Sequence, residues 1–129
     1  MSIADARRVV VADDDADIRA LVAISAARAG LDVVASVEDG VKAWDAIREF
    51  LPDLAILDVA MPGMTGLEVC RLVRADPELA AIPVLLLSAA VDDASRAAGA
   101  DAGALDYLAK PFSPRALVAW LNRDADAVV

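Results

Sequence analysis

The sequence has 129 residues, with 12 Lys and Arg against 21 Asp and Glu, a formal net charge of -9, no His and one Cys. Without His, the chain has no Ser-His or Cys-His nucleophile pair, no imidazole general base, no His-ligated zinc and no phosphohistidine of its own. The length fits one compact domain, and the excess of acidic residues disfavours direct binding to nucleic acid or to an anionic membrane surface.

The single cysteine and the short apolar runs bear on the cellular compartment. Cys70 has no partner for an internal disulfide, which favours a reducing environment. Apolar runs such as residues 84–91 are much shorter than the ~20 residues that span a bilayer. The opening residues lack the apolar segment of a signal peptide. We therefore expect a soluble, cytoplasmic protein with no membrane attachment.

Short runs rich in β-branched residues or leucine recur along the chain and predict strands. These runs are residues 8–12, 32–36, 54–58, 84–88 and 105–109. The segments between them have helical spacing. The first places Ile18, Leu21 and Val22 on one face and is expected to end at Gly30, and the second ends before Pro52.

The later helices have recognisable start signals. Thr65, with Glu68 three residues later, has the capping-box pattern, and Ser113-Pro114 supplies an N-cap and a first helical residue. Strand and helix alternate five times, which predicts right-handed crossovers. We therefore predict an α/β fold, a doubly wound (βα)5 with a five-stranded parallel sheet in the flavodoxin-like order 2-1-3-4-5. Residues 1–129 are read as one domain, with its core at about 8–124 and no visible effector domain.

Polar residues follow four of the predicted strands at the point where each strand ends. Asp13, Asp14 and Asp15 follow the first strand, Asp58 ends the third, Ser88 ends the fourth and Lys110 follows the fifth. Taken singly, each is an ordinary turn, cap or surface residue. Because the carboxyl ends of parallel strands share one edge of the sheet, where ligands of such folds bind, their conjunction predicts a site.

Charge counting indicates what this site holds. The carboxylates of Asp13, Asp14 and Asp58 would repel one another at this edge unless something neutralises their charge. Lys110 offsets one negative charge, and a divalent cation would offset the other two. Oxygen ligands without His or Cys favour Mg²⁺, or Mn²⁺, over zinc. The predicted edge is therefore suited to a metal ion and a phosphoryl group.

Four segments at these strand ends match one protein family. They are residues 9–19, 52–68, 83–89 and 103–112. With these segments in order, the sequence resembles the receiver domains of two-component response regulators over essentially its whole length. The resemblance implies a signalling switch rather than an enzyme, in a bacterial phosphorelay.

The resemblance assigns roles to the site residues. Asp58 would be the phosphoacceptor, forming a 4-aspartylphosphate from the phosphohistidine of a histidine kinase or a His-phosphotransfer protein. Asp14, Asp58 and the backbone carbonyl of Ala60 would ligate Mg²⁺, with Asp13 acting through a coordinated water. Lys110 would pair with the acceptor carboxylate and then with the phosphoryl oxygens.

The resemblance also implies a switch. Ser88 would move toward the phosphoryl group, and Tyr107 would turn inward, remodelling the surface of helix four, strand five and helix five for an unknown protein partner. The peptide bond before Pro111 is expected to be cis. The chain is expected to be a monomer or a weak homodimer. Trp120 lies beside the apolar face of the last helix, and the sequence leaves open whether it packs in the core or contacts a partner.

Other functions remain as alternatives. The sequence is also compatible with the N-terminal receiver part of a longer regulator that has an effector domain, or with a degenerate receiver that serves only as an interaction module. The complete set of acidic residues, Ser88 and Lys110 argues against the degenerate receiver. An aspartyl-phosphate phosphatase is disfavoured because Ala60 stands where such enzymes carry a second Asp.

Overall fold

The computed structural model describes residues 7–90 and 92–128, with side chains to residue 123. The strands are β1 (Arg8–Ala12), β2 (Asp32–Val37), β3 (Leu54–Asp58), β4 (Val84–Ser88) and β5 (Asp106–Ala109). The helices are α1 (Ala16–Arg28), α2 (Gly40–Phe50), α3 (Gly66–Ala75), α4 (Asp93–Asp101) and α5 (Pro114–Val128). All neighbouring strands are parallel and their order is β2-β1-β3-β4-β5, so the predicted fold is confirmed.

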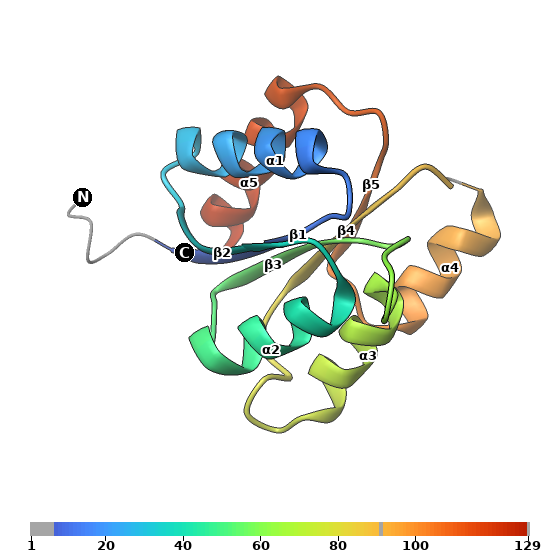
Figure 1. The fold of residues 1–129 in the computed structure, drawn as a ribbon. Helices are drawn as coiled ribbons and strands as arrows, with labels where there is room; N and C mark the ends of the chain where they lie inside the picture. Colours follow the sequence, from blue (N-terminus) through green and yellow to red (C-terminus); the bar gives the residue numbers. More distant parts are fainter. Residues whose placement is uncertain (1–6, 91, 129) are drawn as a thin grey trace.

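The sheet forms the middle of three layers (Figure 1). α1 and α5 cover one face, and α2, α3 and α4 lie on the other. Alternate residues of β1 face these two layers, with Val9 and Val11 packing on one side and Val10 on the other. β3 and β4 are buried along their whole length, as expected for strands covered on both faces.

Two local features shape the start of α3 at the carboxyl edge of the sheet. The Thr65 side chain accepts a hydrogen bond from the Glu68 amide and the Glu68 side chain accepts one from the Thr65 amide, so the predicted capping box is present. At Gly66, a Cβ atom would stand 2.3 Å from the backbone oxygen of Asp58. Glycine there lets the start of α3 rest directly against the end of β3.

The structure places Trp120 in the core. Trp120 is 7% exposed and its indole Nε1 donates a hydrogen bond to Asp106 Oδ2 over 2.6 Å. Asp106, the first residue of β5, thus has a partner on α5 of its own chain. β5 starts at Asp106 rather than at Leu105, although the Leu105 amide still donates to the Val84 carbonyl. Among the described residues, no helix has the length and apolar character needed to cross a membrane.

Candidate functional site

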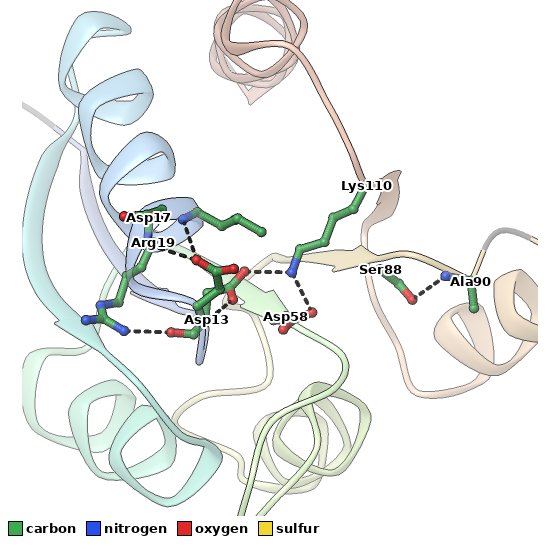
Figure 2. Close-up of polar contacts among 9 residues, drawn as sticks. Asp13, Asp17, Arg19, Asp58, Ser88, Ala90 and Lys110 are labelled. Atoms are coloured by element: carbon green, nitrogen blue, oxygen red, sulfur yellow. Dashed lines mark hydrogen bonds and ion pairs between the residues drawn. The ribbon is translucent and has the colours of Figure 1, made fainter.

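The carboxyl ends of β1, β3 and β5 bring the predicted acidic residues and the lysine together. Asp13 and Asp14 follow β1, Asp58 is the last residue of β3, and Lys110 follows β5. Carboxylate oxygens of Asp13, Asp14 and Asp58 lie within 4.8 Å of one another. Figure 2 shows the Lys110 side chain reaching between Asp13 and Asp58.

Two of these carboxylates are buried and share one cation. Asp13 is fully buried and Asp58 is 4% exposed, whereas Asp14 is exposed. Lys110 Nζ lies 2.9 Å from Asp13 Oδ2 and 3.2 Å from Asp58 Oδ1. Because one ammonium faces three carboxylates, the cluster keeps an excess of about two negative charges when all are ionised.

The pKa of Asp58 reflects this crowding. Burial of the carboxyl and the nearby charge of Asp13 raise its pKa to about 6, although Lys110 pulls it down. Burial alone would lower the pKa of Lys110, but its contacts with Asp13 and Asp58 outweigh burial and raise it. Lys110 therefore stays charged, while Asp58 in the metal-free protein ionises only as the pH approaches neutrality.

The residues fit a hard divalent cation. The available side-chain donors of this cluster are carboxylate oxygens, the ligands that Mg²⁺ and Mn²⁺ prefer. Asp13 Oδ2 is buried, and its one partner among the described residues is the Lys110 ammonium. Ala60 is exposed two residues after Asp58, at the same end of β3. A dication would balance the excess charge with few protein ligands.

Ser88 and Tyr107 are joined through the backbone of Ala90. Ser88 is buried at the end of β4, and its Oγ accepts a hydrogen bond from the Ala90 amide over 3.1 Å, so it points away from Asp58 (Figure 2). The Tyr107 hydroxyl donates to the Ala90 carbonyl. The Tyr107 ring packs under Gly99, where a Cβ atom would stand 3.0 Å from Cδ2, and the Arg96 guanidinium lies 5.8 Å from the ring centre.

Lys110 precedes the one cis peptide bond of the described chain, the Lys110–Pro111 bond. The sequence predicted the acidic side chains, the serine and the lysine of this edge, but not two further contributors. The Arg19 guanidinium donates a hydrogen bond to the backbone oxygen of Asp13, and Ala90 acts only through its backbone. Neither contact has a sequence signature, because a backbone partner leaves no trace in side-chain type.

A doubly wound parallel sheet with this acidic cluster at its carboxyl edge defines a class of α/β domains, those that bind their ligands beyond the carboxyl ends of the strands. The family model described as "Response regulator receiver domain" matches residues 9–122. The chain belongs to this family, the receiver domains of two-component response regulators.

Relatives and solved structures agree with this assignment. MtrA of Mycobacterium tuberculosis, a DNA-binding response regulator, is 42% identical over 113 residues, which are 88% of this chain and 48% of MtrA. The signal receiver domain of the response regulator NarL from M. tuberculosis has a TM-score of 0.86 at 34% identity and covers 94% of this chain and 97% of its own. The chemotaxis response regulator CheY4 of Vibrio cholerae has a TM-score of 0.84 at 32% identity, covering 92% and 98%. The chain spans about half the length of the curated relatives it matches.

Proposed function

We propose that Asp58 is the phosphoacceptor of this receiver and that a histidine kinase or a His-phosphotransfer protein is the donor. The observation that carries the proposal is the position of Asp58: a nearly buried carboxylate with Oδ1 3.2 Å from Lys110 Nζ and two further carboxylates within 4.8 Å. The given sequence contains no His, so the phosphohistidine is supplied from outside these residues.

The residues divide the work of the reaction as follows. A carboxylate oxygen of Asp58 attacks phosphorus, the P–N bond of the phosphohistidine breaks, and the imidazole leaves with the bonding pair. Lys110 holds the attacking carboxylate in place and then faces the phosphoryl oxygens. Asp13, Asp14 and Asp58 would hold Mg²⁺, or Mn²⁺, which supplies charge neutralisation for the phosphoryl group when it is bound. The carbonyl of Ala60 is the proposed backbone ligand.

Small phosphoryl donors test this reaction without a partner. We expect incubation with acetyl phosphate and Mg²⁺ to add one phosphoryl group to the protein, because the site supplies both the nucleophile and the charges that stabilise the transfer. Intact-mass spectrometry measures the product. The matched variant Asp58→Asn keeps the shape of the side chain and is expected to stay unmodified, as is the wild type in excess chelator. A wild-type protein that gains no phosphoryl mass would contradict the proposal.

The output is proposed to pass from Asp58 to the surface of α4, β5 and α5. A phosphoryl group adds about one negative charge and three acceptor oxygens, which attract a donor such as the Ser88 hydroxyl. Movement of Ser88 disturbs its hydrogen bond from the Ala90 amide, and the Ala90 carbonyl holds the Tyr107 hydroxyl. A cavity of about 230 Å³ beside Ser88, lined by α4 residues and Tyr107, leaves room for this movement.

Trp120 is a natural reporter of this coupling. Its indole donates to Asp106, whose other carboxylate oxygen accepts from the Tyr107 amide over 2.7 Å. In a Trp44→Phe variant, which leaves Trp120 as the single tryptophan, we expect a fluorescence change when beryllofluoride and Mg²⁺ are added. Adding Asp58→Asn to this variant is the control and is expected to abolish the change. An unchanged emission spectrum in Trp44→Phe would contradict transmission through β5.

The partner of this surface depends on the rest of the protein. The chain covers 48% of MtrA, which is described as DNA-binding. We propose that, where this receiver is part of a longer regulator of that kind, contact with nucleic acid comes from residues outside the present sequence. The net charge of -9 argues against such contact by the receiver itself.

A further inference from the structure

Arg19 lies beside the acidic loop without pairing with its carboxylates. This residue is on α1, and its Nη1 donates a hydrogen bond to the backbone oxygen of Asp13 over 2.8 Å (Figure 2). Within the described part of the chain, its guanidinium has no hydrogen bond or ion pair with a carboxylate of the site. The oxygens of Asp13 and Asp14 are therefore left for other partners.

The contact closes a ring of interactions around the loop. The Asp13 amide donates to the Val37 carbonyl over 3.1 Å, and Asp13 Oδ1 accepts from the Asp15 amide over 2.9 Å. Asp15 caps α1 through its side chain and accepts the Arg19 amide on its carbonyl. The Arg19 side chain then returns to the Asp13 carbonyl. Loop and helix thus hold each other in one arrangement.

The sign of the charge makes this contact informative. A guanidinium near a cation site opposes a dication by direct repulsion, so on electrostatic grounds alone the site would bind metal better without it. Arginine can instead act by geometry, because its planar group fixes the direction of an acceptor more firmly than an ammonium does. Partners that orient metal ligands without touching the metal commonly contribute to affinity in this way.

We propose that Arg19 is a positioning residue that directs the carboxylates of Asp13 and Asp14 toward Asp58, so that divalent-cation affinity depends on it despite its charge. This inference rests on the proposed function, in which these carboxylates hold Mg²⁺. Arg19 acts through the loop backbone and has no contact with the reacting atoms.

Calorimetric titration with Mg²⁺ alone distinguishes geometry from charge. We expect Arg19→Ala to weaken Mg²⁺ binding about tenfold, at the lower end of the range for partners that orient metal ligands. Arg19→Lys, which keeps the charge but not the planar group, is expected to fall between Arg19→Ala and the wild type. Arg28→Ala is the matched control: it removes the same charge from the exposed last turn of α1 and is expected to leave the affinity unchanged. Equal or stronger binding by Arg19→Ala would overturn the proposal.

Hydrogen exchange in chelator keeps this test separate from the proposed function. In the metal-free protein, we expect the Asp13 and Asp15 amides to exchange several-fold faster in Arg19→Ala than in Arg28→Ala. Equal rates would overturn the role of Arg19, whatever the metal affinity. If the wild type binds no Mg²⁺ while the two variants still differ in exchange, the proposed Mg²⁺ cofactor is wrong, and so is the dependence of metal affinity on Arg19. Only the role of Arg19 in holding the loop would then remain. Circular dichroism is the check that each variant is folded.

Discussion

Replacing Lys110 with alanine is expected to slow the phosphorylation of Asp58 by at least about a hundredfold, the usual effect of removing one preorganised charge from a transfer site. Lys110 Nζ contacts two carboxylates, Asp13 Oδ2 at 2.9 Å and Asp58 Oδ1 at 3.2 Å, and its side chain is only 14% exposed. Without it, the Asp58 carboxyl loses the main group that lowers its pKa, so its ionised form is rarer at neutral pH. The rate is measured from the gain of phosphoryl mass with acetyl phosphate and saturating Mg²⁺.

Lys42→Ala is the control for this prediction. Lys42 pairs with Glu38 at the start of α2, where the two side chains are 55% and 49% exposed. An exposed ion pair of this kind contributes little to stability, so the variant is expected to be phosphorylated at the wild-type rate. If Lys110→Ala reacted as fast as Lys42→Ala, the assignment of Lys110 to the transfer step would be wrong.

Asp58→Asn is expected to stabilise the metal-free protein at neutral pH. The carboxyl of Asp58 has a pKa of about 6 in the folded protein against its ordinary value of 3.8, so the folded state binds its proton more tightly than the unfolded state does. Stability of the wild type therefore falls as the pH rises through this window, and the loss is complete above it. A shift of about two pKa units corresponds to about 3 kcal/mol in the free energy of unfolding, which the wild type loses when Asp58 ionises. Asn at this position carries a neutral amide, so the variant does not have this loss.

Chemical denaturation in chelator at pH 4 and pH 7.5 measures this effect. We expect the two proteins to have similar free energies of unfolding at pH 4, and the variant to be the more stable at pH 7.5. Asp45→Asn, which removes an exposed carboxylate on α2, controls for the change in net charge. Mg²⁺ is expected to narrow the difference, because it binds the folded wild type. A variant no more stable than the wild type at pH 7.5 would show that the Asp58 charge is not crowded.

The fold and the edge that carries the site were predictable from the sequence for a physical reason. Strands buried on both faces, such as β3, require continuous apolar runs, and a parallel sheet sends all its carboxyl ends to one side. The residue types at those ends then predicted a site suited to a metal ion and a phosphoryl group. The residues Asp13, Asp14, Asp58 and Lys110 meet there because the carboxyl ends of β1, β3 and β5 share that edge.

Contacts between distant segments were not predictable in the same way. Whether Trp120 packs inward depends on the crossing of α5 over the sheet, and its hydrogen bond to Asp106 joins two elements whose relative position no periodicity gives. The Arg19 side chain contacts the backbone oxygen of Asp13, and Ala90 acts through its own backbone; every residue carries such backbone groups. The orientation of Ser88 toward Ala90 follows from the path of the chain after β4.

The phosphorylated residue can be identified by chemical mapping of the phosphoryl group. After incubation with acetyl phosphate and Mg²⁺, borohydride reduces an aspartyl phosphate to homoserine, which tandem mass spectrometry locates in the sequence. We expect homoserine at position 58 in the wild type, and none in protein treated without acetyl phosphate. Homoserine at position 13 or 14 instead would contradict the claim that the Asp58 carboxylate receives the phosphoryl group. The same holds if the protein gains phosphoryl mass but contains no homoserine.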